Sequence, residues 1–182
     1  MDPVYFKEIT SKLGLLITFR PEKRIDLEEI WGLYSSLSVE SKESLPTFDR
    51  QLIERWSENL GQYKFPPILA TVKTSSCKER IIGRAVFTYS ERPSAKHRAE
   101  FGIVVHDDFQ DQGIGTELTK FMLDIARRHG LMKVTLEVFS NNKKAIYVYE
   151  KCGFIHEGLL KNHYFFRERF YDVVLMSYTS RI

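Results

Sequence analysis

The hydrophobic and polar positions of this chain follow two periods, which predict both strands and helices. Alternating or continuous apolar runs predict strands at residues 15–20, 68–74, 80–89 and 100–105. Helical spacing predicts one helix with Asp26 as its N-cap and a second helix over residues 47–60. Pro66 and Pro67 end the helical pattern. The first half of the chain is therefore expected to supply one strand, two helices and a meander of further strands.

The second half of the chain predicts a helix that connects two strands. Between Gly113 and His129 one helical face is apolar, formed by Ile114, Leu118, Phe121, Met122, Ile125 and Ala126. Gly130 suits the left-handed position that often follows a helix. A strand near residues 134–138, a helix after Asn142, and strands over 154–159 and 164–178 complete the pattern. The helix from Gly113 to His129 joins the strand over 100–105 to the strand near 134–138. Because a helix connects them, these two strands are expected to be parallel.

Length and composition fit one domain over residues 1–182. The chain has 182 residues, of which 43% are hydrophobic, so it can bury a core. A net charge of +3 does not indicate nucleic-acid binding, and the basic residues between Lys73 and Arg98 are expected to form a solvated face. Nucleic-acid binding through that segment is the alternative, and it predicts a steep dependence of affinity on salt.

The same sequence predicts a cytoplasmic protein without a membrane partner. No apolar run reaches the roughly 18 residues needed to cross a bilayer. Asp2, Lys7 and Glu8 interrupt any signal-peptide pattern at the start of the chain. Cys77 and Cys152 are too few for a disulfide framework or a cysteine-rich zinc site, and we expect both to be reduced thiols.

A polar loop with two glycines joins the strand over 100–105 to the helix that follows. Gly113 and Gly115 let a ligand approach the backbone closely, and the helix start presents unpaired N–H groups. These features are typical of pyrophosphate binding. A Walker loop is excluded, because Thr116 and Glu117 stand where it needs Lys and then Ser or Thr. A dinucleotide-binding fingerprint is excluded as well, because Leu118 occupies its third small position.

Two motifs connect this loop to a known family. Gln110-x-x-Gly113-x-Gly115 resembles the coenzyme A motif of the GNAT superfamily of N-acetyltransferases. Residues 136–154 are similar to a second part of that family, with a strand, an Asn-x-x-Ala helix start at Asn142, Tyr149, and a Gly-Phe ending. The resemblance implies an α/β (mixed α+β) acyl-CoA N-acyltransferase fold. Its central sheet is mixed and mostly antiparallel, with two splayed parallel strands and flanking helices.

The resemblance also implies an activity. It predicts an acyltransferase that moves an acetyl group from acetyl-CoA, its co-substrate, directly to a primary amine in a ternary complex. The acceptor is a small amine, a polyamine, an amino-acid derivative or a protein N-terminus, and the sequence does not choose among these. The protein is expected to act as a monomer or a homodimer. The alternative is a regulatory module that binds coenzyme A without turnover.

The residues expected to bind acetyl-CoA follow from the same resemblance. Backbone amides from Gln110 to Gly115 would hold the pyrophosphate, and a backbone N–H near Val104 or Val105 would stabilise the oxyanion. Asn142 would touch the pantetheine arm or act only as an N-cap. Asp111 departs from the family, because relatives usually have glycine there. The full set is Val104, Val105, Gln110, Asp111, Gln112, Gly113, Ile114, Gly115, Thr116, Asn142 and Tyr149.

Three residues are candidates for acid–base catalysis. Tyr149 occupies the position of the family's catalytic tyrosine, and a phenol with a pKa near 10 is suited to protonate a departing thiolate. The base is Glu100, at the start of the strand before the loop, or Glu137 on the adjoining strand. The sequence leaves these two alternatives open.

The remaining acidic, histidine and cysteine residues of this half of the chain are expected to have structural roles. His106, Asp107, Asp108 and Asp111 match no zinc spacing, and acidic loops are ordinary turn chemistry, so we expect no metal. Cys152 is expected to be a buried structural thiol rather than a nucleophile that carries an acyl group.

Overall fold

The computed structural model of the chain describes residues 5–45, 48–74, 78–90 and 92–180. The chain forms two compact units: Met1–Val86 with Ile103–Met122, and Phe87–Gly102 with Leu123–Ile182. The strands are β1 (Lys7–Thr10), β2 (Leu16–Pro21), β3 (Ile68–Lys73), β4 (Glu79–Tyr89), β5 (Arg98–Val105), β6 (Lys133–Phe139), β7 (Ile155–Phe166) and β8 (Arg169–Thr179).

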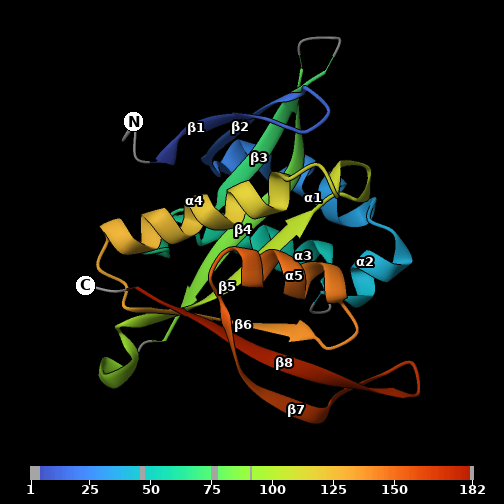
Figure 1. Cartoon of the computed structure of the whole chain (residues 1–182). Helices are drawn as coiled ribbons and strands as arrows, with labels where there is room; N and C mark the ends of the chain where they lie inside the picture. The colour runs from blue at the N-terminus through green and yellow to red at the C-terminus, as the bar shows by residue number, and fades with distance from the viewer. Residues whose placement is uncertain (1–4, 46–47, 75–77, 91, 181–182) are drawn as a thin grey trace. The chain divides into compact units, whose positions relative to one another are not determined.

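Helices flank these strands in the way that the predicted fold class requires. The α-helices are α1 (Leu27–Ser35), α2 (Val39–Glu43), α3 (Arg50–Glu58), α4 (Ile114–Arg128) and α5 (Lys143–Lys151). Short 3₁₀ turns are η2 (Arg24–Asp26), η3 (Leu60–Gln62), η4 (Pro93–Ala95) and η5 (Asp107–Phe109). The strands belong to one mixed sheet in the order β1-β2-β3-β4-β5-β6-β8-β7 (Figure 1). The predicted mixed sheet with flanking helices is therefore confirmed.

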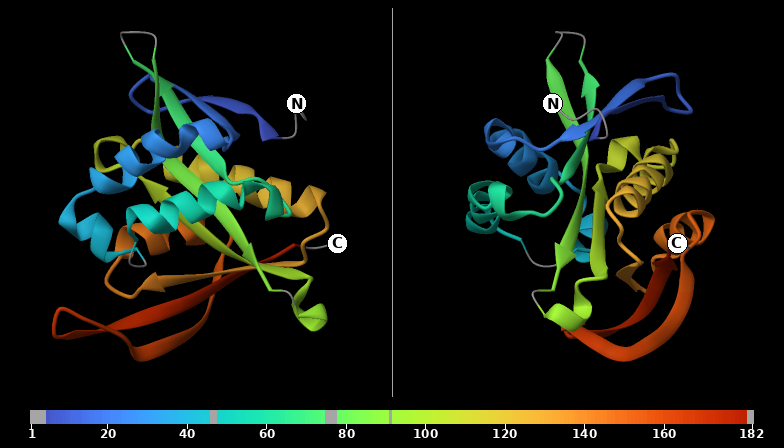
Figure 2. Two further views of the ribbon diagram at one scale, coloured as in Figure 1. Left: turned by 180° about the vertical axis from the view of Figure 1, so that it is seen from behind. Right: turned by 90° about the vertical axis from the view of Figure 1, so that its left-hand side faces the viewer.

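In the first unit, β1 to β4 form an antiparallel meander in which each strand pairs with the next, and β2, β3 and β4 of this meander were predicted. Helices α1 and α3 lie side by side on one face of these strands, and the start of α4 lies on the other face (Figure 2). The α1 and α3 side is filled by a cluster that includes Ile30, Leu33, Ile53, Leu69 and Val104. On the α4 side, the rings of Phe19 and Phe121 are 5.7 Å apart. Burial of these apolar side chains on both faces holds the layers together.

Asp26 is the N-cap residue of the first helix, as predicted, but its carboxylate does not cap the helix. Its two oxygens instead accept hydrogen bonds at 2.8 Å from the buried guanidinium of Arg20. The second predicted helix is α3, which begins after Asp49, and the Asp49 carboxylate accepts a hydrogen bond from the N–H of Leu52 at 2.7 Å. Residue 47, its predicted start, lies outside the described residues.

The basic segment between Lys73 and Arg98 is not entirely the solvated face that we expected. Arg84 is buried, and its Nε donates a hydrogen bond to the carboxylate of Glu22 at 2.6 Å. Its guanidinium also lies over the ring of Trp56, 4.7 Å from the centroid. A buried guanidinium requires such partners because desolvation of an unpaired charge is costly. Arg84 therefore contributes to the core of the first unit.

In the second unit, β5 and β6 form the predicted parallel pair, but over a short distance. Their register comprises Arg98↔Lys133, Ala99↔Val134 and Glu100↔Thr135. Strand β6 continues to Phe139, pairing there with β8 on its other side. The ladder therefore ends at Glu100, as expected for strands that splay apart. Strand β7 pairs with β8, and the two form a long twisted ribbon (Figure 2).

The two helix ends predicted to contain glycine are confirmed. Gly130 follows α4 with φ of 72°, and Gly153 follows α5 with φ of 92°. After α5, the N–H of Phe154 donates a hydrogen bond to the carbonyl of Tyr149 at 3.0 Å. Left-handed glycine at this position lets the chain turn back and satisfy the last carbonyl groups of the helix.

Three elements differ from the sequence predictions. Strand β1 and helix α2 were not predicted, because they contain only 4 and 5 residues and carry too few apolar positions to show a period. The predicted strand over 164–178 is wrong as a single element, since β7 ends at Phe166 and β8 begins at Arg169. The turn between them places Arg167 and Glu168 at φ of 48° and 59°. This backbone normally favours Asn or Gly, so the sequence carried no turn signal.

Gly83 in β4 is expected to tolerate no side chain. An ideal Cβ there would lie 2.9 Å from the backbone oxygen of Val104 and 3.4 Å from the Cβ of Ala70. Because a strand backbone must shift to relieve this contact, Gly83→Ala should lower the free energy of unfolding by about 1–3 kcal/mol. Urea denaturation measures the change. Gly32→Ala in α1 is the matched control, since nothing lies within 4 Å of its Cβ, and it should not destabilise. Equal stabilities of the two variants would contradict the prediction.

Candidate functional site

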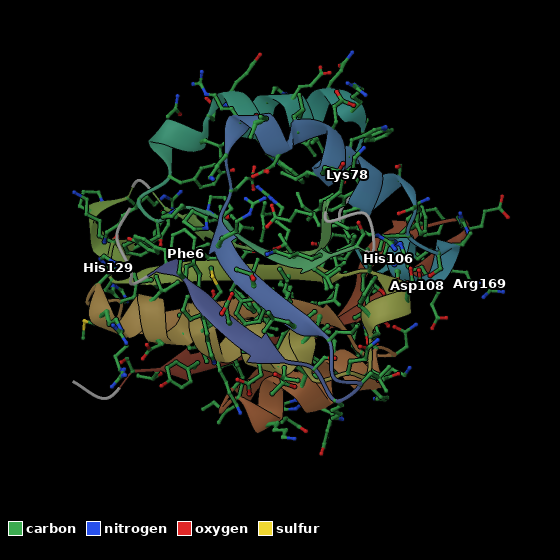
Figure 3. The ribbon with its side chains drawn as sticks, turned by 90° about the horizontal axis from the view of Figure 1, so that it is seen from above. Phe6, Lys78, His106, Asp108, His129 and Arg169 are labelled. Carbon is green, nitrogen blue, oxygen red and sulfur yellow. The ribbon has the colours of Figure 1, made fainter. Side chains whose placement is uncertain are left out.

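The loop after β5 is anchored by a buried histidine. The N–H of His106 donates a hydrogen bond to the carbonyl of Ile82 at 2.8 Å, and its Nδ1 accepts one from the N–H of Asp108 at 3.2 Å. His106 and Asp108 are neighbours at the end of β5 (Figure 3). The Nε2 atom of His106 lies 3.1 Å from the hydroxyl of Ser36. These contacts fix where the loop leaves the strand.

Two further loop side chains are hydrogen-bonded to the segment around α2. The carboxylate of Asp107 accepts hydrogen bonds from the N–H and the hydroxyl of Ser38, both at 2.8 Å. Burial opposes ionisation of Asp107, but bonds from Ser41 and Ser38 outweigh it and lower the pKa. The amide of Gln110 donates hydrogen bonds to the carbonyl of Val105 at 3.1 Å and to the hydroxyl of Ser41 at 3.3 Å. Both side chains therefore brace the loop.

The centre of the loop presents backbone amides. Among the described residues, no acceptor is found for the N–H groups of the four residues from Gln112 to Gly115. Asp111 and Gly113 have φ of 59° and 85°, and these left-handed residues turn the chain sharply into α4. Unpaired amides at the start of a helix form a site for an anion, with the positive end of the helix dipole behind them. The geometry fits a phosphate or diphosphate.

The remaining predicted coenzyme residues of the first unit lie at the end of β5, in the loop and at the start of α4. Val104 and Ile114 are buried in the core, whereas Val105, Gly115 and Thr116 are partly exposed. Gln112 is 8% exposed, and its amide nitrogen donates a hydrogen bond to the carbonyl of Asp108 at 3.0 Å. Its side-chain oxygen is buried and lacks a partner within the described ranges. The first unit thus brings together all nine predicted coenzyme residues between Val104 and Thr116.

The other predicted residues belong to the second unit. Asn142 caps α5, and its side-chain oxygen accepts a hydrogen bond from the N–H of Ala145 at 3.1 Å. Tyr149 lies two turns later in α5 and is 8% exposed. Its ring packs against Phe101 and Phe154, at centroid distances of 6.4 and 5.7 Å. Burial raises the pKa of the Tyr149 phenol, so the hydroxyl holds its proton over a wider pH range than a free tyrosine.

Both candidate bases lie on exposed positions of neighbouring strands. Glu100 on β5 and Glu137 on β6 alternate with buried residues, as the strand pattern predicted. Partial burial of its carboxyl raises the pKa of Glu100, and the negative charge of Glu137 raises it further, against the opposite effect of Arg98. The charge of Glu137 therefore acts on the carboxyl group of Glu100.

Tyr164 is a further residue of this group that sequence reasoning did not select. Its hydroxyl donates a hydrogen bond to the Glu137 carboxylate at 3.0 Å. Burial raises the pKa of Tyr164, and the bond to Glu137 raises it further. Tyr164 comes from β7, and only the pairing of β7 with β8 and of β8 with β6 brings it to Glu137. No local pattern in the sequence could indicate this contact.

Three further observations concern metal binding, the cysteines and membrane spans. Among the described residues, no group of three or more His, Cys, Asp and Glu side chains is arranged to hold a metal ion. Cys152 is buried at the end of α5, while Cys77 lies outside the described residues. None of the helices in the described ranges is long and apolar enough to span a membrane.

Comparison with known families identifies the chain. Residues 28–154 match the Acetyltransferase (GNAT) family. The chain belongs to this family. Because the match includes both the loop after β5 and the segment through Phe154, it covers the two motifs from which the resemblance was drawn.

Individual relatives are N-acetyltransferases. The spermidine N(1)-acetyltransferase of Vibrio cholerae is 38% identical over 82 residues, which are 44% of the chain and 47% of that protein. The ribosomal protein bS18-alanine N-acetyltransferase of Escherichia coli is 32% identical over 77 residues, 42% of the chain and 52% of that protein. The chain thus spans about half the length of the curated relatives it matches.

A solved structure supports the fold assignment. A proposed acetyltransferase of Salmonella typhimurium, determined with its cofactor acetyl-CoA, is 20% identical to the chain. The two superpose with a TM-score of 0.77, over 90% of this chain and 93% of that one. This likeness confirms the GNAT fold that the two sequence motifs predicted.

Asp111 generates a prediction about coenzyme affinity. Its left-handed φ of 59° is a conformation that favours glycine, and its carboxylate belongs to a loop whose amides suit an anion. Asp111→Gly should therefore lower the Kd for coenzyme A by about two- to fivefold, as expected from removing an exposed like charge. Isothermal titration calorimetry measures this Kd. Asp111→Asn, which removes only the charge, should act in the same direction.

Asn162→Gly is the control for these variants, because Asn162 in the β7–β8 ribbon also has a left-handed φ, of 51°. It should leave the Kd for coenzyme A unchanged. A Kd for Asp111→Gly equal to that of the wild type would show that the Asp111 charge does not act on the ligand.

Proposed function

We propose that the protein is an acetyl-CoA-dependent N-acetyltransferase that transfers an acetyl group directly to a primary amine in a ternary complex. The observation that carries the proposal is the run of amides from Gln112 to Gly115 without acceptors in the described structure, at the start of α4. In a GNAT-family chain this geometry suits the diphosphate of coenzyme A. The whole chain, residues 1–182, would act as one N-acetyltransferase domain.

Different residues would bind acetyl-CoA, stabilise the oxyanion and protonate the thiolate. The acetyl donor would be held by the loop amides, with the side chains of Asp107 and Gln110 positioning the loop rather than touching the ligand. A backbone N–H near Val104 or Val105 would stabilise the carbonyl oxygen as it becomes anionic. Tyr149 would protonate the departing thiolate, and its raised pKa means that the phenol carries its proton at neutral pH.

The acceptor amine must lose a proton before it attacks the thioester. Glu100 is the proposed base, because its raised pKa brings it closer to the optimum for proton transfer near neutral pH. Glu137 is the alternative base. The proposed acceptor is a polyamine or a protein amine, and the names of two relatives, a spermidine N(1)-acetyltransferase and a ribosomal protein bS18-alanine N-acetyltransferase, support this choice. A cytoplasmic location, where acetyl-CoA is available, fits this function.

An acceptor screen tests the proposal. The purified protein is incubated with acetyl-CoA and a panel of polyamines, amino-acid derivatives and peptide N-termini, and release of the coenzyme thiol is followed. Amine-dependent thiol release and detection of the acetylated amine would support the proposal. Thermal stabilisation by coenzyme A without turnover on any amine would indicate a binding module instead.

Tyr149→Phe should reduce turnover far more than coenzyme affinity. The substitution removes only the hydroxyl, so the ring contacts with Phe101 and Phe154 remain. Loss of a general acid is expected to lower kcat by about a hundredfold or more. The Kd for acetyl-CoA should change little. Tyr147→Phe, at an exposed position of the same helix, is the control. Wild-type turnover in Tyr149→Phe would remove Tyr149 from the mechanism.

The coupling of the two glutamates predicts a pH effect. A base acts in its ionised form, so the raised pKa of Glu100 makes activity fall on the acid side at a higher pH than for an ordinary glutamate. Glu137→Gln removes the neighbouring negative charge and lowers the pKa of Glu100. The acid limb of kcat/KM should therefore move to lower pH, while activity at neutral pH is retained.

The reciprocal variant separates the two candidate bases. If Glu100 is the base, Glu100→Gln should lose activity over the whole pH range. Loss of activity in Glu137→Gln, with activity retained in Glu100→Gln, would assign the base to Glu137.

A further inference from the structure

The turn between β1 and β2 is attached to the loop that carries the coenzyme motif. The backbone N–H of Lys12 in this turn donates a hydrogen bond to the carbonyl of Gln112 at 3.1 Å. From the adjoining strand, the ammonium of Lys7 pairs with the carboxylate of Glu117 in the first turns of α4 at 3.0 Å. These contacts join residues about 100 positions apart in the sequence and place the turn against the loop amides.

The turn that carries Lys12 has a defined conformation. Ser11 is buried, and its hydroxyl oxygen accepts hydrogen bonds from the N–H groups of Leu13 at 3.3 Å and Leu15 at 3.2 Å. Gly14 supplies the left-handed backbone with φ of 81°. A turn closed in this way holds the backbone of Lys12 in one place. Only the Lys12 side chain must then be ordered when a ligand binds.

The side chain of Lys12 extends along the loop. Its Cε lies 3.8 Å from the position that a Cβ on Gly113 would occupy, and its Nζ lies 3.4 Å from the carbonyl oxygen of Asp111. The ammonium therefore lies beside the backbone segment whose amides suit a diphosphate. Lys12 is exposed, so its ammonium is accessible to a ligand at the loop.

We infer that Lys12 binds the diphosphate of coenzyme A, supplying from the β1–β2 turn a cation that the loop itself lacks. This inference rests on the proposed function. The loop motif contains no lysine after Gly115, where a Walker loop has one, and it carries the carboxylate of Asp111. An ammonium beside the loop offsets that negative charge and adds charge-assisted hydrogen bonds to phosphate oxygens.

Titration of Lys12→Met with coenzyme A tests the inference. The Kd should rise by about tenfold at low ionic strength, the loss expected for one hydrogen bond between charged groups. Lys12→Arg should restore most of the affinity because it keeps the positive charge. Salt screens an exposed ion pair, so the difference between wild type and Lys12→Met should shrink at high ionic strength. A loss caused by a displaced turn would not shrink in this way.

Two controls exclude other causes. Lys7→Met breaks the ion pair with Glu117 and leaves Lys12 in place, so its Kd should stay near that of the wild type. Dephospho-coenzyme A lacks the 3′-phosphate and keeps the diphosphate. Lys12→Met should therefore weaken its binding by the same factor as that of coenzyme A. Circular dichroism and thermal unfolding confirm that each variant is folded before titration.

The outcomes are distinct. Wild-type binding of coenzyme A with no change in Lys12→Met would overturn the inference and leave the proposed function intact. An effect of Lys12→Met that disappears with dephospho-coenzyme A would assign Lys12 to the 3′-phosphate and overturn the inference as well. An equal loss in Lys7→Met and Lys12→Met would show that docking of the turn, rather than the charge of Lys12, matters. Failure of the wild-type protein to bind coenzyme A would overturn both proposals.

Discussion

The candidate site depends on one constraint: several backbone amides at the start of α4 must point outward without an internal acceptor. Buried or half-buried amides are normally paired, so a run from Gln112 to Gly115 with none in the described structure is costly unless a ligand or water satisfies it. The left-handed residues Asp111 and Gly113 create the run by turning the chain sharply into the helix. The surrounding contacts maintain this loop conformation.

Polar side chains around the loop form hydrogen bonds that hold it in place. From the sequence, His106, Asp107 and Gln110 could be ligand-binding or catalytic residues. In the structure they form hydrogen bonds with the backbone and with three serines, Ser36, Ser38 and Ser41. In the second unit the roles are reversed. Glu100, Glu137 and Tyr164 are exposed strand residues, and the hydroxyl of Tyr164 donates its hydrogen bond to the Glu137 carboxylate. Polar residues thus brace the loop in the first unit and form the proposed acid–base group in the second.

Much of the fold was predictable because its central elements are long and strongly patterned. Helix α4 has 15 residues with one apolar face, and β4 has 11, so their periods are clear. The short β1 and the Arg167–Glu168 turn left no such signal. The candidate site was predictable where a motif lies within one segment, as at Gln110 to Gly115. Contacts made by Lys12 and Tyr164 were not, because they arise only when distant strands are assembled.

The attachment of the β1–β2 turn to the loop has a consequence for folding. Besides Ile82, the loop and the start of α4 have partners 66 to 110 residues away in sequence, at Ser41 and Lys7. Closing such long segments is entropically costly and is repaid only when the first unit is nearly complete. The anion site should therefore form late in folding. A ligand that binds only when the β1–β2 turn is docked on the loop stabilises the docked turn by mass action. Local unfolding of β1 and release of the ligand are therefore thermodynamically linked.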